Sequence, residues 1–239
     1  AGDGHTCALD RLERAWCWGS NWNGQVGNGT IDIMGVPAPV RVTGLGGGLN
    51  GISAGADHTC ALDRLGRAWC WGAGGHGQVG DGADRDRRAP VRVSGLSRGL
   101  TGLDLRSDRS CALDRSSRAW CWGQGASTPS RVNGLSSGLT RLAVGWDHAC
   151  VLDRMNRARC WGNNWNGQLG DGTETSRPAP ALVRRLPGGL ISLAAGGAHS
   201  CALDHGGLAW CWGANLSGQL GDGSTLDRLS PVQVRATSL

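Results

Sequence analysis

The sequence contains no phenylalanine and no tyrosine, and its 24 basic residues are all arginine because lysine is absent too. No run of 18 apolar residues occurs, so a membrane-spanning helix is not predicted. Apolar residues also lack the 3.6-residue period of amphipathic helices, and 42 glycines and 8 prolines interrupt the chain. These absences predict many short β-strands joined by turns. The start shows neither an initiator methionine nor a signal-peptide pattern, so we expect a mature or excised segment.

The net charge of +5 is modest for 239 residues. Arginine is interspersed with aspartate, as in Asp10–Arg11 and in residues 84–87. Such mixing indicates a solvated surface of mixed charge rather than a nucleic-acid-binding patch.

Five copies of one pattern fill the chain. The motif His-Thr-Cys-Ala-Leu-Asp at 5–10 returns at 58–63, with variants that place the first cysteine of later units at 111, 150 and 201. Ala-Trp-Cys-Trp-Gly or a close variant follows in every unit, and Gly-Gln-Val/Leu-Gly follows in four, the third unit lacking it. Each unit supplies about four short apolar segments, which is typical of a four-stranded propeller blade.

The order Gly-x-x-His-x-Cys-Ala-Leu, Trp-x-Trp-Gly, Gly-Gln-Leu-Gly-Asp-Gly and Pro-x-x-Val resembles the repeat of the regulator of chromosome condensation family over essentially the whole chain. The resemblance implies an all-β fold, a β-propeller usually of seven blades. With five repeats, we predict one propeller domain over residues 1–239. The first residues and the strand at 231–239 are nearly complementary, so a closed five-bladed ring is the simplest arrangement, and part of a seven-bladed propeller is the alternative.

The ten cysteines form five pairs, each ten residues apart. Pairing the two cysteines of a unit gives the register of a tight hairpin, in which opposed Cα atoms lie about 4.5 Å apart, within disulfide range. We therefore predict one disulfide per repeat; reduced buried thiols and a metal site are the alternatives. The predicted pairs are Cys7–Cys17, Cys60–Cys70, Cys111–Cys121, Cys150–Cys160 and Cys201–Cys211. Disulfides indicate an oxidising compartment: secreted, cell surface or periplasm. The cysteines also resemble those of the family's secreted bacterial branch.

Histidine and tryptophan recur within the pattern. A histidine stands two residues before the first cysteine in four units, and we interpret it as a structural group rather than a catalytic or metal-binding one. The tryptophans beside the second cysteine are predicted to pack between blades. Trp22, Trp146 and Trp165 fall outside this pattern and are candidate binding residues, Trp22 and Trp165 in matching loops.

Arginines recur in four of the five predicted hairpin turns, which would all lie at the same end of their blades. The candidate binding residues there are Arg11, Arg64, Arg115 and Arg154, together with Arg87 and Arg88 in an irregular loop. One interpretation is a docking surface for an anionic partner. The other is local pairing with the aspartate that opens each turn.

The sequence shows no nucleophile–base pair, no phosphate loop and no metal-ligand spacing, so we expect no enzyme activity, no cofactor and no metal. The resemblance implies a family of binding platforms, including a secreted bacterial enzyme inhibitor. We predict an extracytoplasmic protein-interaction or structural subunit, whose partner is a protein or a larger surface or envelope assembly. The alternatives are an enzyme inhibitor, a binder of an anionic polymer or small ligand on the face or in the channel, and an enzyme with a channel site.

Overall fold

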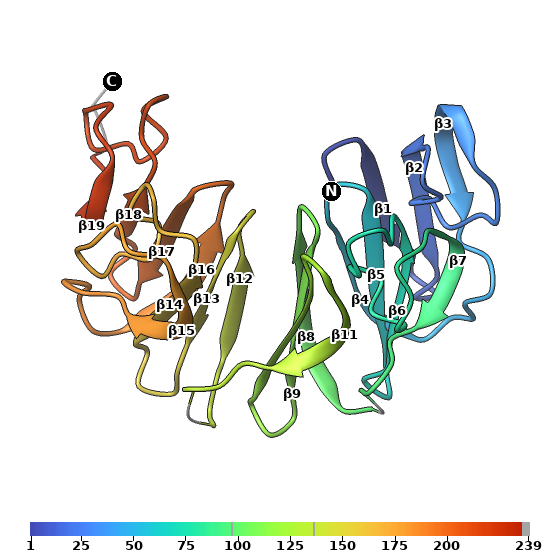
Figure 1. The fold of residues 1–239 in the computed structure, drawn as a ribbon, viewed down its shortest axis with the longest axis horizontal. Coiled ribbons are helices and arrows are strands. Elements are labelled where there is room, and N and C mark those ends of the chain that lie inside the picture. The colour runs from blue at the N-terminus through green and yellow to red at the C-terminus, as the bar shows by residue number, and fades with distance from the viewer. Residues whose placement is uncertain (97, 136, 236–239) are drawn as a thin grey trace. The chain divides into compact units, whose positions relative to one another are not determined.

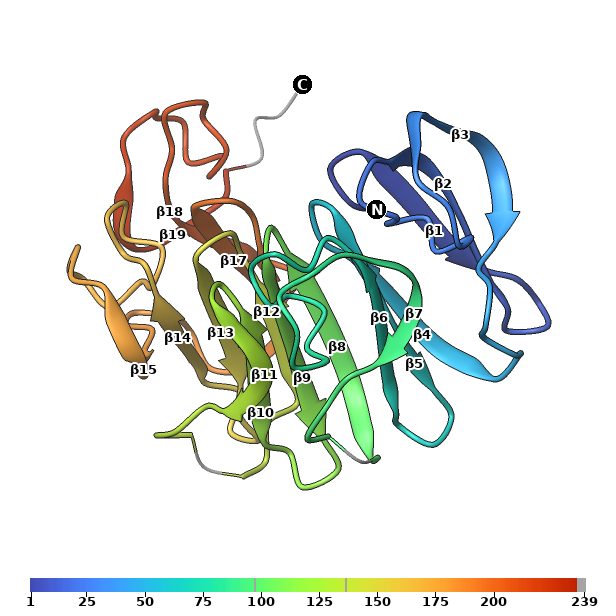
Figure 2. The same cartoon turned by 45° about the vertical axis from the view of Figure 1, so that its right-hand side comes forward.

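A computed structural model describes residues 1–96, 98–135 and 137–235, and every element in it is a β-strand (Figure 1, Figure 2). Each repeat forms one antiparallel sheet, here called a blade. Blade 1 contains β1 (His5–Leu9), β2 (Ala15–Asn21) and β3 (Asp32–Arg41); blade 2 contains β4 (Leu49–Ala54), β5 (His58–Asp63), β6 (Ala68–Gly72) and β7 (Arg87–Arg92). Blade 3 contains β8 (Leu100–Arg106), β9 (Arg109–Asp114), β10 (Ala119–Gly123) and β11 (Ala126–Arg131). Blade 4 contains β12 (Arg141–Val144), β13 (His148–Leu152), β14 (Ala158–Gly162) and β15 (Arg177–Leu182); blade 5 contains β16 (Leu190–Ala195), β17 (His199–Asp204), β18 (Ala209–Gly213) and β19 (Arg228–Gln233).

Four blades have four strands, as predicted, whereas blade 1 has three. Among the described residues, no strand stands before β1 in the way that β4, β8, β12 and β16 stand before β5, β9, β13 and β17. The predicted last strand is β19, and residues 236–239 of that prediction lie outside the described part of the chain.

The predicted disulfides are confirmed in all five blades, with Cα atoms 4.1 Å apart in each pair. The cysteines face one another directly, as in Cys7↔Cys17, so the hairpin register is the one that the spacing predicts. The turn between them requires a positive φ at its fourth residue. The residues there are Glu13 (57°), Gly66 (73°), Ser117 (55°), Asn156 (55°) and Gly207 (79°).

Contacts divide the chain into two compact units. Unit 1 comprises residues 1–115 and 119–131, which include blades 1, 2 and 3; unit 2 comprises residues 116–118 and 132–239, which include blades 4 and 5. In each unit the core lies between neighbouring blades, with Trp71 and Trp122 buried in unit 1 and Trp212 in unit 2. In the described part of the chain, no helix is long and apolar enough to cross a membrane.

Candidate interaction surfaces

A repeated hydrogen-bond cluster joins neighbouring blades within each unit. The backbone carbonyl of Gln25 in blade 1 accepts from two groups of blade 2, the Trp71 indole at 2.9 Å and the Thr59 hydroxyl at 2.9 Å. The same hydroxyl lies 2.7 Å from Nε2 of His5. The cluster recurs in unit 1 as Gln78, Trp122, Ser110 and His58, and in unit 2 as Gln168, Trp212, Ser200 and His148. We call this set the inter-blade cluster.

Three of the four recurring histidines, His5, His58 and His148, belong to this cluster and are buried, whereas His199 is only partly buried. Because the Thr59 hydroxyl donates to the Gln25 carbonyl, Nε2 of His5 must donate to the hydroxyl, which requires the neutral ring to carry its proton there. Burial lowers the pKa of His58 to about 3 and that of His5 to about 4. These histidines therefore connect blades, as the structural interpretation predicts.

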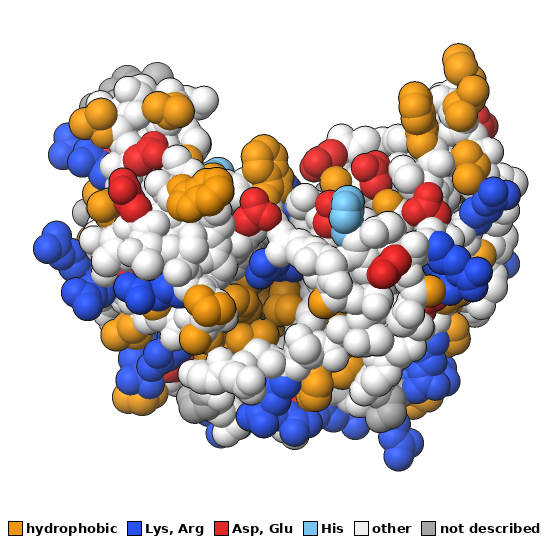
Figure 3. All heavy atoms as spheres, in the orientation of Figure 1, with side chains coloured by type: hydrophobic (Ala, Val, Ile, Leu, Met, Phe, Trp, Pro, Cys, Tyr) orange, Lys and Arg blue, Asp and Glu red, His pale blue; other side chains and the backbone are white. Residues whose placement is uncertain are grey.

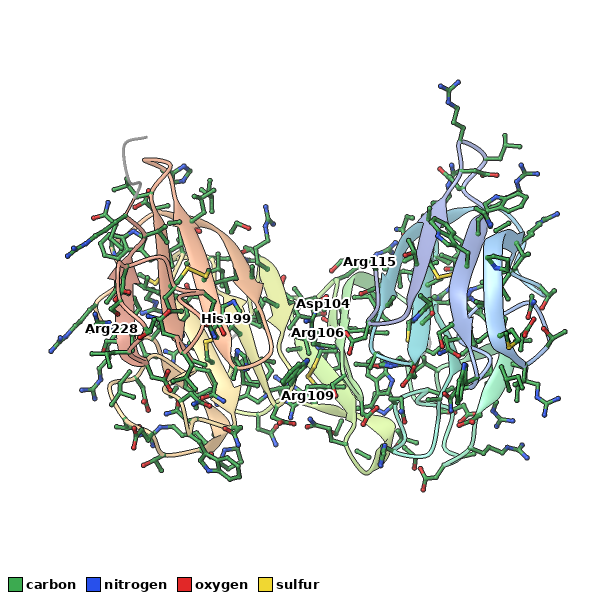
Figure 4. All side chains as sticks on the ribbon, turned by 90° about the horizontal axis from the view of Figure 1, so that it is seen from above. Asp104, Arg106, Arg109, Arg115, His199 and Arg228 are labelled. Carbon is green, nitrogen blue, oxygen red and sulfur yellow. A yellow bond between two sulfur atoms is a disulfide. The ribbon has the colours of Figure 1, made fainter. Side chains whose placement is uncertain are left out.

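Repeat 3 departs from the cluster in a coordinated way. It lacks the Gly-Gln segment, and Arg106 and Arg109 stand opposite one another where repeat 2 has Gly55 and His58 (Figure 4). Glycine leaves room for the histidine, because a Cβ on Gly55 would lie 2.3 Å from the His58 ring and 2.8 Å from the Ser107 carbonyl oxygen. Arg109 instead donates to Oε1 of Gln124 at 3.0 Å.

The hairpin turns lie at one end of each blade, which we call the arginine edge. Each turn is organised by its first aspartate: Asp63 accepts from the backbone of Leu65 at 3.0 Å and of Arg67 at 2.9 Å. Its second oxygen accepts from Arg67 at 2.6 Å and from the Trp69 indole at 3.4 Å. Burial raises the pKa of Asp63, but the hydrogen bonds from Arg67 outweigh it and leave the pKa lowered. The carboxylate is thus ionised and structural.

The candidate arginines are not the ones that pair with these aspartates. In repeats 1, 2 and 4 the turn aspartate binds the later arginine of the turn, as in Arg14–Asp10 and Arg157–Asp153. Repeat 5 has Leu208 at that position. Of the candidates, Arg64 pairs with Glu13 of the preceding repeat. Arg11, Arg115 and Arg154 are exposed. Blue side chains gather along this edge of both units in Figure 3.

The remaining arginine candidates, Arg87 and Arg88, are the first two residues of β7 and not part of an irregular loop as predicted. Arg87 forms an ion pair with Asp81, and the corresponding pairs are Arg177–Asp171 at 2.5 Å and Arg228–Asp222 at 2.6 Å. Arg87 is therefore part of a repeated loop closure that sequence reasoning did not identify. Arg88 is exposed, and its carbonyl accepts from Gly29 of blade 1.

The opposite end of each blade, which we call the tryptophan edge, carries the three tryptophan candidates. Trp22 is 64% exposed and Trp165 is 77% exposed, each at the first position of its loop after an asparagine. Those asparagines are fully buried: Oδ1 of Asn164 accepts from the Leu169 backbone at 2.8 Å, and its Nδ2 donates to the Thr173 carbonyl at 2.8 Å. Trp146, in the turn between β12 and β13, is half exposed. The edge therefore presents large aromatic side chains on loops with defined backbones.

Sequence reasoning missed further groups on the tryptophan edge. Ile33 and Met34 are exposed beside Trp22, and Leu216 takes the place of Trp165 in blade 5. Aspartates also collect there in unit 1: burial and the nearby charges of Asp108 and Asp3 raise the pKa of Asp57. Figure 3 shows acidic and apolar side chains at this end of the view. The two-residue insertion that carries Ile33 and Met34 is visible in a repeat alignment, and could have drawn attention to them.

Sequence comparison matches the Regulator of chromosome condensation (RCC1) repeat at residues 13–62, 66–101, 160–203 and 206–238. A second description of the same repeat matches residues 51–78, 140–168 and 190–219. The chain belongs to the RCC1 repeat family. The ultraviolet-B receptor UVR8 of Arabidopsis thaliana is 30% identical over 237 residues, which are 98% of this chain and 44% of UVR8. The probable E3 ubiquitin-protein ligase HERC6 of Homo sapiens is 28% identical over 92% of this chain and 18% of its own length.

Solved structures give the same fold. Human WBSCR16 superposes with a TM-score of 0.88 at 21% identity, over 98% of this chain and 66% of that one. Prp20p of Saccharomyces cerevisiae gives 0.84 at 20% identity, over 98% and 62%. The propeller fold predicted from the RCC1 repeats is thus confirmed, and this chain spans less than two thirds of the relatives that it matches.

Proposed function

We propose that this RCC1-repeat chain is a non-enzymatic scaffold that binds a protein partner through the tryptophan edge, outside the cytoplasm. The exposure of Trp22 and Trp165 carries the proposal. A tryptophan contributes a large apolar area at low entropic cost, and tryptophans are enriched among the residues that dominate binding energy. Since buried asparagines fix both loops, little further ordering is needed on binding.

The disulfides support the proposed compartment. Five disulfides persist only where thiols are not kept reduced, which favours a secreted, cell-surface or periplasmic location. The related protein Prp20p has binding properties to Gsp1p and histones, which supports protein partners for this fold in general. A secreted inhibitor would use the same edge, with an enzyme as its partner.

The non-enzymatic part of the proposal rests on how the candidate catalytic groups are used. His5, His58 and His148 are committed to inter-blade clusters, and the turn aspartates to hairpin backbones.

Quantitative capture from the native extracellular or envelope fraction tests the proposal, with the oxidised chain as bait. Trp22→Ser and Trp165→Ser, tested singly, are expected to lower recovery of the partner at least tenfold. Arg11→Ala, an exposed change at the arginine edge, is the control and leaves recovery unchanged. Equal recovery by all variants, or no partner recovered by the wild-type bait, contradicts the proposal.

A further inference from the structure

Blade 4 carries a cavity of about 390 Å³ at its arginine edge, within unit 2. The hairpin turn contributes Met155 and Arg157 to its wall. The connection between β15 and β16 contributes residues 182–188. Its volume falls in the range of small-molecule sites. It lies at the opposite end of the blade from Trp165, so it is separate from the proposed tryptophan edge.

The connection that forms this cavity departs from the repeat at a position of unusual backbone conformation. Repeats 1, 2 and 3 have glycine at this position, and repeat 4 has Arg185 with the same backbone conformation. The φ values are +71° at Gly44, +73° at Gly95, +81° at Gly134 and +62° at Arg185. A residue with a Cβ adopts this region only at a cost in free energy, and such strain concentrates at functional sites. Repeat 4 has this less favourable backbone conformation and carries a guanidinium group beside the cavity.

Two further substitutions change the chemistry of the same connection. Leu182, the last residue of β15, stands where repeats 1, 2 and 3 have Arg41, Arg92 and Arg131 and repeat 5 has Gln233. Arg184 stands where those three repeats have Thr43, Ser94 and Asn133, and repeat 5 also has an arginine there, Arg235. With Met155, which is 69% exposed, Leu182 forms an apolar wall. Relative to repeats 1, 2 and 3, repeat 4 has therefore exchanged one arginine for an apolar group and gained two arginines nearby.

The positive charge of the arginines around the cavity is not neutralised by a carboxylate in the cavity wall. Asp153, the carboxylate of the nearest turn, accepts from Arg157 at 2.9 Å and from the backbone of Met155 at 2.9 Å. The cavity wall contains no Asp or Glu among the residues that the structure describes. Arg184 and Arg185 are both exposed, and neither side chain bonds a described carboxylate. The site thus combines two available guanidinium groups with an apolar surface.

We propose that this cavity binds a carboxylate that is attached to an apolar group. A guanidinium fork pairs with both oxygens of a carboxylate, and Met155, Leu182 and Leu186 would contact the apolar part. Two sources share this chemistry: a free carboxylic acid with a short hydrocarbon chain, and the C-terminus of a peptide that ends in an apolar residue.

Calorimetric titration of the oxidised full chain tests the proposal with both sources. The probes are octanoate and acetyl-Gly-Leu-Leu with a free carboxylate, each compared with its neutral amide. At least one acid is expected to bind saturably at one site, with its amide at least tenfold weaker. Preference between the two acids identifies the source. No binding by either acid, or equal binding of acid and amide, overturns the proposal.

Variants separate binding from folding. Arg185→Gly restores the residue of repeats 1, 2 and 3, so we expect binding of the acid to weaken at least tenfold while the thermal midpoint stays equal or rises. Met155→Ser removes apolar contact and is expected to weaken binding several-fold. Arg11→Ala, at the corresponding edge of blade 1, is the matched control and leaves binding unchanged. Unchanged binding in a folded Arg185→Gly variant overturns the assignment.

Discussion

At the scale of single residues, this protein repeats a few polar side chains whose roles are local and structural. The turn aspartate is the clearest case, because one carboxylate accepts from two backbone amides, a guanidinium and an indole. The arginine that donates to this carboxylate, such as Arg67, is therefore not available to bind a ligand. The neighbouring arginine is left to solvent or to another repeat, as with Arg64 and Glu13.

Removal of one turn aspartate should therefore destabilise the fold. Asp63→Ala leaves two backbone amides, the Arg67 guanidinium and the Trp69 indole without their acceptor. We expect a loss of about 1–3 kcal/mol in the free energy of unfolding, measured by urea denaturation. Asp84→Ala, at an exposed loop position, is the control and should stay within about 0.5 kcal/mol of wild type. Similar stabilities for the two variants would contradict this role.

At the scale of elements, the inter-blade cluster explains why the repeat contains its particular residues. The backbone carbonyl of the Gly-Gln segment accepts hydrogen bonds from a tryptophan indole and a hydroxyl of the next blade. The histidine of the first of these two blades bonds the same hydroxyl. These residues come from two repeats. Repeat 4 has Ala149 in place of the hydroxyl, and repeat 3, before it, lacks the Gly-Gln segment. Repeat 4 keeps a buried tryptophan, Trp161, so only the Gly-Gln segment, the histidine and the hydroxyl are lost together.

The buried histidines give the cluster a dependence on pH. The pKa of His58 is about 3 and that of His5 about 4 in the folded chain, against an unfolded value near 6.5. The unfolded state therefore takes up protons first as the pH falls. Stability should be complete above pH 6.5 and decrease below it, by up to about 1.4 kcal/mol per pH unit for each histidine.

Urea denaturation of the oxidised protein between pH 7 and 4.5 measures this decrease. His58→Gln removes one of these buried groups and should flatten the profile. An unfolding free energy that is constant from pH 7 to 4.5 would contradict the buried neutral histidines.

At the scale of the whole molecule, the five disulfides dominate the resistance to unfolding. Each closes a ten-residue loop, which stabilises the chain by about 2–3 kcal/mol in the chain-entropy description. Cys60, Cys70, Cys111, Cys150 and Cys160 are completely buried. Reductant should therefore reach most of the disulfides only after unfolding.

Intact-mass measurement checks this expectation. Reductant with urea should raise the mass by about ten daltons, two hydrogens for each disulfide, whereas reductant alone should act far more slowly. The fully reduced chain should also unfold at a lower urea concentration than the oxidised one. Cysteines that react with an alkylating agent in urea before any reduction would show that the pairs are thiols.

Much of the fold was predictable from the sequence because its determinants are local. Cys7 and Cys17 are ten residues apart and opposed across a short turn, and the alternation of side chains along a strand has a fixed period of two. Hairpin register, disulfide pairing and the number of blades follow from such spacing. The family resemblance added the propeller, and the structural comparisons confirm it.

The candidate surfaces were only partly predictable, because their determinants lie in contacts between chain segments. Sequence position marked Trp22 and Trp165 as exceptions to the repeat, but whether they are exposed depends on what packs against each loop. Arg87 and Arg154 both stand near aspartates in the sequence. Only the folded structure shows that Arg87 forms an ion pair with Asp81, whereas Arg154 is exposed. The inter-blade cluster rests on a backbone carbonyl of Gln25, which no side-chain pattern reveals.

The sequence by itself determined the repeat, the hairpin register and the disulfides, since each depends on residues within one unit and on the geometry of a β-strand. The tertiary structure alone decided which polar groups bond other parts of the chain and which remain exposed and able to bind a ligand. That division depends on burial and on partners from neighbouring blades, as with Thr59 and His5. The tertiary structure also shows that Arg185 has a positive φ, as glycine does in repeats 1, 2 and 3, and lies beside a cavity.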